Sequence, residues 1–532
     1  MGFDELKNLT RGFIKGWKKG KLKEKLVETA ESLLDEKIKN AELEETVGQL
    51  RDEILRLKGE KSKPKIKPAN TNKDLNPKKK KPHKKRSKKS EFEIDETVEL
   101  DVDKDELPSD AKKVGTREVV IQEMKIERRN IKFVVHRYWS ESLGRVIEGV
   151  IPDGFKGSEF GPQLRTFVIY QFYKCRTPHN KILSMLSDWG IEMSAGTLCR
   201  LLNSSGVDFK DDLASAKESA LKKQSRVFID DTGARIKGFN GYTYGICNDY
   251  FTEYITGFEK NRWSAVGALL TEQKFYIDDD AISFVAEKLK RAKVTAQLYT
   301  VKEQEFNRDG FEEKLKEIYT FEIRKDELDI VRSAGAISAL RRDKKIKFLI
   351  SDDGTNFVDI LKNHQLCWVH EIRKYKKLPL VHEVLIKELD KVLDKWRSLY
   401  KKMKRFSRSP NSELREEIRE EFDTIVEDKT KIKLIDKQLD LTNKLKDKLL
   451  LFLKYPQLPL NSNMVERDLR ERVIKRKISL QNRSLDGVRA WDLMLSLMST
   501  CRKINLSFWN YLEDRISKRE EIPYLGKLVT SL

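Results

Sequence analysis

The sequence predicts an α/β protein. Apolar runs that are typical of buried strands occur at residues 227–229 and 346–350, and acidic residues follow each run directly. Segments with helical periodicity separate and follow these runs, above all residues 376–456. Hydrophobic residues make up 39% of the 532, which suffices for a large core and excludes a chain that is disordered throughout.

The charge balance favours a nucleic-acid partner. The 107 Lys and Arg residues against 86 Asp and Glu residues leave a formal net charge of +21. Such an excess is typical of proteins that bind polyanions, because contacts to phosphates release counterions. A lysine-rich surface that only maintains solubility is the alternative.

Membrane and secretory functions are not expected. No apolar run is long enough to span a bilayer, and the start of the chain lacks the features of a secretory signal. The five cysteines are scattered and form no CxxC pair, which predicts a reduced, cytosolic protein without a disulfide framework.

Residues 1–60 are predicted to form a helical segment with a short coiled coil. Their apolar residues step alternately by four and three positions, which is the seam spacing of a coiled coil. These residues are Leu43, Val47, Leu50, Ile54 and Leu57. Two heptads are marginal alone, so a helix packed on its own chain and a dimer both remain open.

Residues 61–115 are predicted to form a charged, disordered linker. The basic block 77–89 is followed directly by the acidic block 91–106, and runs of like charge are normally disordered. The basic block could contact the DNA backbone, and the acidic block could compete for it. A solvated linker without such contacts is the alternative.

Residues 116–222 are predicted to form a hairpin followed by a helical DNA-binding region. Alternating apolar positions predict two strands over 116–127 and 130–140. Two helices are predicted to follow, over 162–174 and 178–189.

The end of this region has the pattern of a helix-turn-helix. One helix ends at Gly190, and a second begins after Ser194, whose hydroxyl can cap it. The second helix would enter a major groove, where Thr197 and Arg200, three positions apart, could reach base edges together. A helical hairpin that never touches DNA is the alternative.

The next segment predicts the start of an RNase H-like sheet. The apolar strand 227–229 delivers Asp230 and Asp231, and two further strands follow around 242–247 and 251–258. A strand that carries an acid at its end, followed by an antiparallel hairpin, is how such a sheet begins.

A second strand, 346–350, repeats the arrangement. Asp352 and Asp353 stand at its carboxyl end, where an α/β sheet places its ligand crevice. A short fifth strand is expected over 366–370.

A third acid, Glu466, belongs to the C-terminal region 457–532. A helix begins near Ser462 or Asn463, which places Glu466 in its first turn. The long intervals between the three acids predict insertions. The core 223–375 would hold one of mixed helix and strand over 265–342, and a helical one would follow over 376–456.

Asp230, Asp352 and Glu466 together suggest metal-dependent chemistry on a phosphate. Carboxylates are the ligands that Mg²⁺ prefers, and two such ions could flank a scissile phosphodiester. The alternative is ordinary, because acids at strand ends often only cap or solubilise.

Several blocks resemble the insertion-sequence-66 family of transposases. They are VFIDDTGAR, FLISDDG followed by CWVHEIRKYKK, LPLNSNMVERDLRERVIKRKISL and the closing NLSFWNYLEDRI. The resemblance runs from about Arg117 to the end of the chain. It implies a DDE transposase on an RNase H-like fold, with Asp230, Asp352 and Glu466 as catalytic metal ligands and Mg²⁺ (or Mn²⁺) as cofactor.

This resemblance implies an enzyme that binds the terminal inverted repeats of its own insertion sequence and catalyses strand cleavage and strand transfer. Its partners would be double-stranded DNA of the element ends and of the target, further copies of the chain as a homo-oligomer on DNA, and companion proteins of the same element. Its location would be the bacterial cytoplasm, in association with the nucleoid.

Two alternatives remain open: a catalytically silent DNA-binding protein derived from a transposase, and an RNase H-fold nuclease without strand transfer. The chain also departs from the family pattern. Many members carry an N-terminal CxxC zinc module, whereas no cysteine precedes Cys175 here. The ends of the element would therefore be recognised by another region.

Further residues are predicted to support the acids. Asp231 and Asp353 would act as neighbours or helix caps, and His370 would hold phosphate or an adjacent acid. Cys367 and His370 form a CxxH pair, which would bind zinc only if two more ligands joined it.

Basic residues near the acids are predicted to contact DNA phosphates, with a solvated helix face as the alternative. They are Arg373, Lys374, Arg467, Arg470, Arg472, Lys475, Arg476 and Lys477.

Overall fold

The computed structural model describes residues 115–203, 207–271 and 274–532, with residues 94–100, 108, 111 and 112 and individual positions between 29 and 50. The chain divides into two compact units, Thr46–Glu127 and Met1–Glu45 with Arg128–Leu532. The second unit contains every strand that the described residues form. None of the described helices is long and apolar enough to cross a membrane.

Part of the N-terminal prediction lies outside the described residues. This holds for Ile54, Leu57 and the basic block 77–89. The described seam residues Leu43, Val47 and Leu50 are helical and exposed, so their packing in a coiled coil stays a prediction.

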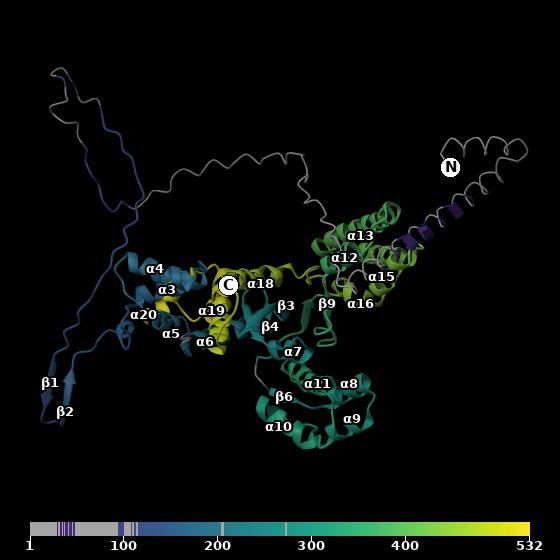
Figure 1. The fold of residues 1–532 in the computed structure, drawn as a ribbon, viewed down its shortest axis with the longest axis horizontal. Helices are drawn as coiled ribbons and strands as arrows, with labels where there is room; N and C mark the ends of the chain where they lie inside the picture. Colours follow the sequence, from purple (N-terminus) through teal and green to yellow (C-terminus); the bar gives the residue numbers. More distant parts are fainter. Residues whose placement is uncertain are drawn as a thin grey trace, which may run out of the picture. The chain divides into compact units, whose positions relative to one another are not determined.

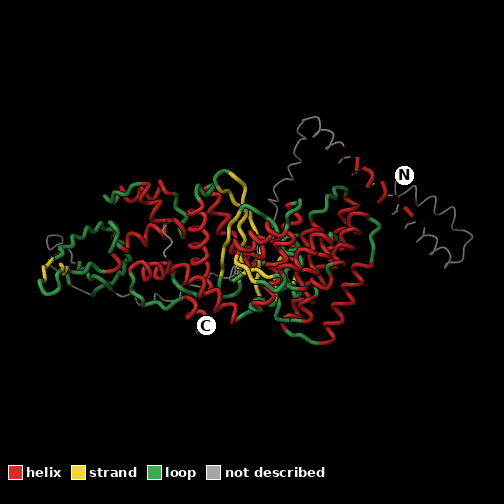
Figure 2. Tube along the Cα trace, turned by 90° about the horizontal axis from the view of Figure 1, so that it is seen from below, coloured by secondary structure: helices red, strands yellow, loops and turns green. Residues whose placement is uncertain are grey.

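A five-stranded mixed sheet carries the predicted aspartates, and helices flank it (Figures 1 and 2). Its strands, in the order β5-β4-β3-β8-β9, are β5 (Thr252–Gly257), β4 (Phe239–Cys247), β3 (Arg226–Ile236), β8 (Phe348–Ser351) and β9 (His364–Leu366). The pairs β5–β4 and β4–β3 are antiparallel, whereas β8 and β9 run parallel to β3. The predicted α/β class is therefore confirmed.

Two strand predictions differ from the structure in their bounds. Asp230 and Asp231 lie inside β3, which continues to Ile236, rather than at its end. β8 pairs only with the first three residues of β3, and the next pairing beyond Phe228 on that side is a bridge between Ile236 and Asn482. β9 ends at Leu366, so the prediction of a strand through His370 was wrong, and His370 lies on helix α12 (Trp368–Lys376).

The predicted hairpin was also wrong in its place. Residues 116–136 form no strand, and the hairpin forms between β1 (Arg137–Ser140) and β2 (Arg145–Glu148). Gly144 closes it with a φ of 59°, a left-handed conformation that glycine adopts without strain. The stretch between the two predicted strands contains no glycine.

The predicted helices before the sheet are confirmed. They are α3 (Pro162–Tyr173), α4 (His179–Asp188) and α5 (Ala195–Asn203), and a further helix, α6 (Val207–Lys223), follows them. Gly190 has a φ of 69°, which ends the turn after α4, and Ser194 caps α5 by accepting from the Thr197 N–H at 3.0 Å. These helices share one hydrophobic cluster with the sheet.

Both expected insertions are present. Between β5 and β8 lie α7 (Arg262–Leu269), β6 (Lys274–Tyr276), α8 (Asp279–Leu289), α9 (Ala292–Leu298), β7 (Glu305–Asn307), α10 (Arg308–Ile318) and α11 (Lys325–Asp343). After α12 come α13 (Glu383–Arg408), α14 (Ser412–Glu427), α15 (Lys433–Lys444), α16 (Lys446–Leu449) and α17 (Leu451–Lys454), which build a second hydrophobic cluster.

Helix α19 (Leu485–Lys503) accepts hydrogen bonds from β5, the strand at the outer edge of the sheet. Side chains one turn apart on this helix accept hydrogen bonds from alternate backbone N–H groups of β5, at 2.8, 2.9 and 3.1 Å. The pairs are Asp492 with Thr256, Ser496 with Tyr254, and Thr500 with Thr252. An edge strand that would otherwise present unpaired donors is thereby covered. Two further helices, α20 (Phe508–Ser517) and α21 (Leu525–Ser531), end the chain.

Helix α18 (Asn463–Ser479) packs closely on the sheet because β4 has a glycine beneath it. A Cβ atom at Gly245 would lie 2.9 Å from the Leu469 side chain and 3.3 Å from that of Val465, both on α18. Gly245 pairs with Asp230 on β3. The glycine thus sets the distance between α18, which carries Glu466, and the strand that carries Asp230.

We expect Gly245→Ala to lower the free energy of unfolding by about 1–3 kcal/mol, since the added methyl group overpacks the contact with α18. Gly257→Ala is the matched control in the neighbouring strand, because a Cβ atom there meets nothing within 4 Å. Chemical unfolding followed by tryptophan fluorescence measures both. Equal stability of the two variants would contradict close packing of α18 on the sheet.

Candidate active site

The two aspartates lie level with each other on neighbouring parallel strands. Phe228 of β3 pairs with Ile350 of β8, and Asp230 and Asp352 each stand two residues further along. Side chains two apart on a strand share a face, and neighbouring strands are about 4.8 Å apart. The register therefore brings the two carboxyl groups together at the point where β8 ends.

The carboxyl group of Asp230 is partly buried, and its charged form is unfavourable. Burial raises its pKa to about 7; the charge of Asp352 adds to this shift, whereas the N–H of Asp231 and the charge of His370 oppose it. Asp352 also accepts a hydrogen bond from the Gly354 N–H at 3.0 Å, which fixes its carboxylate.

Glu466 lies in the first turn of α18, as predicted. Its carboxylate lies 3.7 Å from His370 Nε2 and 3.6 Å from an Nη atom of Arg373, both on α12. Its Oε1 atom is buried and accepts no hydrogen bond from the residues that the structure describes. Cys367, Glu466 and Asp352 raise the pKa of His370, with Cys367 as the largest cause, so an imidazolium is favoured beside the acids.

The adjacent acids Asp231 and Asp353 have cationic partners. Asp231 forms a salt bridge with Lys260 at 2.7 Å and accepts a hydrogen bond from Asn356 at 3.2 Å. Asp353 pairs with Lys374, which also contacts Glu371. Sequence reasoning missed Lys260 and Asn356, because only the fold brings these distant residues to the aspartates.

The basic residues of α18 divide into two sets. Arg467, Arg470 and Lys477 are exposed and follow a helical spacing of three and seven, so they lie on one face. The prediction of DNA contact was wrong for Lys475 and Arg472, which are buried. Lys475 donates instead to the Phe172 carbonyl at 2.7 Å, and burial lowers its pKa to about 7.

The remaining predicted DNA contacts are exposed or partly exposed. Thr197 and Arg200 lie on the outer side of α5, where an Arg200 Nη atom donates to Thr197 Oγ1 at 3.1 Å. Arg373 is exposed beside Glu466, Lys374 is held by its two acids, and Arg476 is partly buried near the end of α18.

A preassembled metal cluster is absent from the described part of the chain, where no three His, Cys, Asp or Glu side chains lie close enough together to hold an ion. This leaves the CxxH pair without further ligands. The chemistry of the three acids nevertheless suits a hard cation. Asp230 and Asp352 repel each other, and Glu466 has a buried oxygen without a donor.

Comparison with known proteins agrees with this arrangement. The family model described as "Transposase IS66 family" matches residues 157–265 and 268–490, which include all three acids and the helices from α3 to α18. A protein of Sinorhizobium fredii (strain NBRC 101917 / NGR234), described as "Uncharacterized protein y4jO", is 32% identical over 296 residues. That similarity covers 54% of this chain and 91% of the relative.

The family model that matches this region describes transposases, which are DNA-processing enzymes. The chain belongs to the IS66 family of transposases. The match begins at residue 157 and ends at residue 490, so it does not reach back to Arg117 or include the closing NLSFWNYLEDRI segment.

We expect Asp230→Asn to stabilise the metal-free protein at alkaline pH. The pKa of Asp230 is about 7 in the folded chain against 3.8 ordinarily, so the folded state binds the proton more tightly and wild-type stability falls as the pH rises from 4 to 7. At pH 8 the variant should exceed the wild type by about 4 kcal/mol, and below pH 4 the difference should vanish.

Denaturant unfolding in chelator-containing buffer across this pH range measures the effect. Asp211→Asn, on the exposed face of α6, controls for the chemical change itself. Parallel pH profiles for wild type and Asp230→Asn would contradict a buried, coupled carboxyl group.

Proposed function

We propose that this chain is a DDE-type DNA transposase that binds the terminal inverted repeats of its own element, cleaves them and joins the ends to target DNA. Asp230, Asp352 and Glu466 would be its catalytic residues. The observation that carries the proposal is the level pairing of Asp230 and Asp352 on parallel strands. Glu466 is linked to them through His370, which lies 3.7 Å from Glu466 and whose pKa both Glu466 and Asp352 raise. Membership of the IS66 family supports the proposal.

The proposal includes an RNase H-like core. Its support is the strand order β5-β4-β3-β8-β9, with an antiparallel meander of three strands followed by two strands parallel to the first. Asp352 follows the carboxyl end of β8, where open α/β sheets bind ligands, and Asp230 lies level with it on the neighbouring β3.

The three acids would hold Mg²⁺ or Mn²⁺, which would supply activation of the attacking oxygen and stabilisation of the leaving oxygen. His370 and Arg373 would orient the Glu466 carboxylate, since both approach it within 4 Å. Lys260 and Lys374 would hold Asp231 and Asp353 away from the reacting phosphate through their salt bridges.

DNA binding would use two surfaces of the chain. The exposed face of α18, with Arg467, Arg470 and Lys477, would contact backbone phosphates next to the acids. Helix α5 would read the element ends, because Arg200 is exposed and contacts the partly exposed Thr197 on the same side of the helix. Assembly as a homo-oligomer on DNA, with companion proteins of the element, completes the proposal.

Cleavage of end-containing DNA should require Mg²⁺ or Mn²⁺ and fall by at least about 10³-fold in Asp230→Asn, Asp352→Asn and Glu466→Gln, because each removes a carboxylate ligand. Binding of the same DNA should persist. Asp486→Asn, an exposed acid at the start of α19, is the control.

Gel analysis of labelled substrate and target separates the possible results. Full cleavage by a variant of Asp230, Asp352 or Glu466 would show that this residue is not catalytic. Cleaved ends that are never joined to target would support a nuclease without strand transfer. DNA binding without any cleavage by the wild type would support a catalytically silent DNA-binding protein.

We expect Arg200→Ala to lower the preference for element ends over scrambled DNA about tenfold, because an arginine that pairs with guanine contributes about 1–3 kcal/mol of discrimination. Lys181→Ala, an exposed cation of α4, should weaken both DNAs equally. Competition binding at one fixed salt concentration measures the ratio. An unchanged ratio for Arg200→Ala would place end recognition outside α5.

A further inference from the structure

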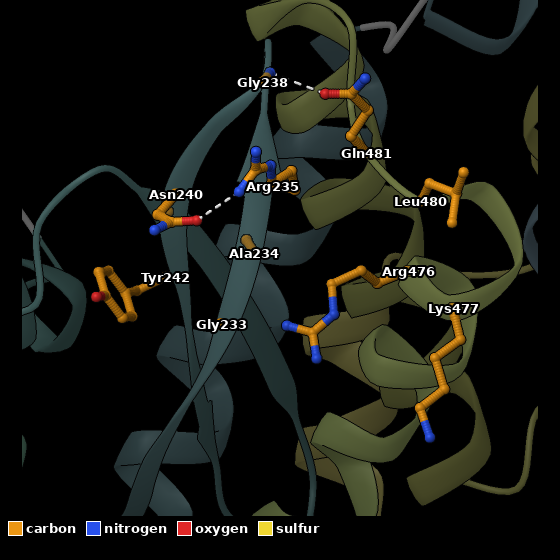
Figure 3. A pocket seen from close by; sticks show the side chains of 11 residues that line it. Gly233, Ala234, Arg235, Gly238, Asn240, Tyr242, Arg476, Lys477, Leu480 and Gln481 are labelled. Atoms are coloured by element: carbon orange, nitrogen blue, oxygen red, sulfur yellow. Dashed lines mark hydrogen bonds between the residues drawn. The ribbon is translucent and has the colours of Figure 1, made fainter. Parts of the chain in front are cut away.

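The strand that carries Asp230 is held by hydrogen bonds on both sides. β3 pairs with β4 over most of its length. Beyond the acids, the turn after β3 is attached to the segment that follows α18, because the Gly238 N–H donates to Gln481 Oε1 at 2.8 Å (Figure 3). The Asn482 N–H also donates to the Arg235 carbonyl at 3.0 Å. The position of Asp230 is therefore fixed by its own strand.

Asp352, by contrast, begins a long loop. Residues 352–363 join the parallel strands β8 and β9, and the structure describes no helix among them. A connection between parallel strands usually contains an α-helix, whose internal hydrogen bonds hold it in one conformation. This loop instead buries the side chains of Phe357 and Ile360 in the core. Its polar part, which includes Asp352, depends on contacts with other elements.

The loop positions two groups of the site. Asp352 accepts a hydrogen bond from the Gly354 N–H at 3.0 Å, within the loop itself. Asn356, which is 4% exposed, donates to Asp231 at 3.2 Å. A shift of the loop would therefore move Asp352 and release Asp231 at the same time.

The first insertion, α7 to α11, holds the middle of the loop. Arg262 of α7 donates through Nε to the Val358 carbonyl at 2.9 Å and through an Nη atom to the Thr355 carbonyl at 3.4 Å. These two carbonyls lie on either side of Asn356 along the chain. One guanidinium thus fixes the backbone around Asn356.

Asp359 connects the same loop to both insertions. One of its carboxylate oxygens lies 2.8 Å from Lys288 Nζ of α8, and the other lies 3.5 Å from Lys448 Nζ of α16, which belongs to the second insertion, α13 to α17. The three side chains are 31–33% exposed, so water screens their charges only in part. Burial opposes ionisation, but the hydrogen bond from Lys288 and the charges of both lysines lower the pKa of Asp359. Asp359 is therefore a carboxylate.

The backbone of Asp359 is left-handed, with a φ of 65°. Asp and Asn adopt this conformation more readily than most other residues with a side chain. The conformation itself requires no charge, whereas the two lysines do. Asp359→Asn therefore removes the carboxylate and preserves the conformation of the loop at this position.

We propose that Asp359 is a positioning residue through which both insertions hold Asp352 beside Asp230. Lys288 and Lys448 fix Asp359, and the loop passes this constraint on to Asp352. The two insertions, which lie apart in the sequence, thereby act on the site through one carboxylate. This inference rests on the proposed function, because it concerns the position of one of its catalytic residues.

The test compares the full-length wild type with Asp359→Asn. Hydrogen–deuterium exchange of the peptide 352–363 in metal-free protein should become at least about tenfold faster in the variant, because the loop opens more often. Mn²⁺ binding that Asp352→Asn abolishes, measured by calorimetry, should weaken about tenfold, as it does for residues that orient metal ligands. The kcat for cleavage of end-containing DNA should fall by about the same factor, with the KM for DNA changed less than about twofold.

Two controls break one salt bridge in each insertion away from the loop. Asp279→Asn breaks the pair with Lys302 in the first insertion, and Asp428→Asn breaks the pair with Lys395 in the second. Both controls should leave the exchange of the loop and the affinity for Mn²⁺ unchanged. Thermal unfolding verifies that each variant is folded.

A double-mutant cycle separates the two ion pairs from general effects on the fold. Lys288→Met and Lys448→Met should each weaken Mn²⁺ binding about threefold and add little to Asp359→Asn, since residues of one salt-bridge cluster do not act independently. Full additivity of both lysine variants with Asp359→Asn would contradict a role of the insertions in holding the loop.

Loop exchange and Mn²⁺ affinity that change no more in Asp359→Asn than in the two controls would overturn the proposal. Faster loop exchange with unchanged Mn²⁺ affinity would also overturn it, because Asp359 would then stabilise the loop without positioning Asp352. Failure of the proposed function is distinguishable. A wild type that binds Mn²⁺ at Asp352 but cleaves no DNA would refute that function, whereas the exchange and binding measurements need no reaction.

Discussion

The buried guanidinium of Arg472 joins the parts on which the site depends. It is 2% exposed and donates to Thr243 of β4 and Thr256 of β5 at 3.3 and 3.2 Å. It also lies 3.5 Å from Asp492 of α19 and over the ring of Trp491. A charge this deeply buried is tolerated only with such partners, and its loss would leave Asp492 unpaired. The position of α18 on the sheet is therefore fixed by chemistry as well as by shape.

Helix α18 has one side that packs on the core and one side that presents cations to solvent. On its inner side, Asp468 accepts from Thr252 at 2.7 Å, and Lys475 attaches the helix to the end of α3. On its outer side, exposed cations begin one turn after its start and continue to Lys477. The buried contacts of Asp468 and Lys475 hold the helix on the core, and the exposed cations lie between and beyond them on the outer side. The position of these cations relative to the aspartates is therefore fixed.

The sequence predicted the elements whose signals are local. Apolar runs followed by acids located β3 and β8, and the cap at Ser194 located α5. Charge alone could not separate the cations of α18, because a lysine that enters the core and one that faces solvent have the same side chain. Lys475 is buried only because the carbonyl of Phe172, some 300 residues earlier in the chain, lies beside it. For the same reason the sequence did not predict the roles of Lys260 and Asn356, whose contacts with Asp231 depend on the tertiary fold.

The charges around the three acids show how such a centre can exist in a folded chain. Salt bridges neutralise the outer pair, Asp231 and Asp353, whereas burial and mutual repulsion leave Asp230 beside Asp352 with a pKa near 7. The unfavourable electrostatic energy is thus concentrated at Asp230 and Asp352. Favourable contacts elsewhere in the fold, such as the hydrogen bonds of Arg472, offset it. A cation that joins these acids would relieve the repulsion. The electrostatic repulsion that destabilises the centre would therefore also be the origin of the divalent-ion binding that we propose.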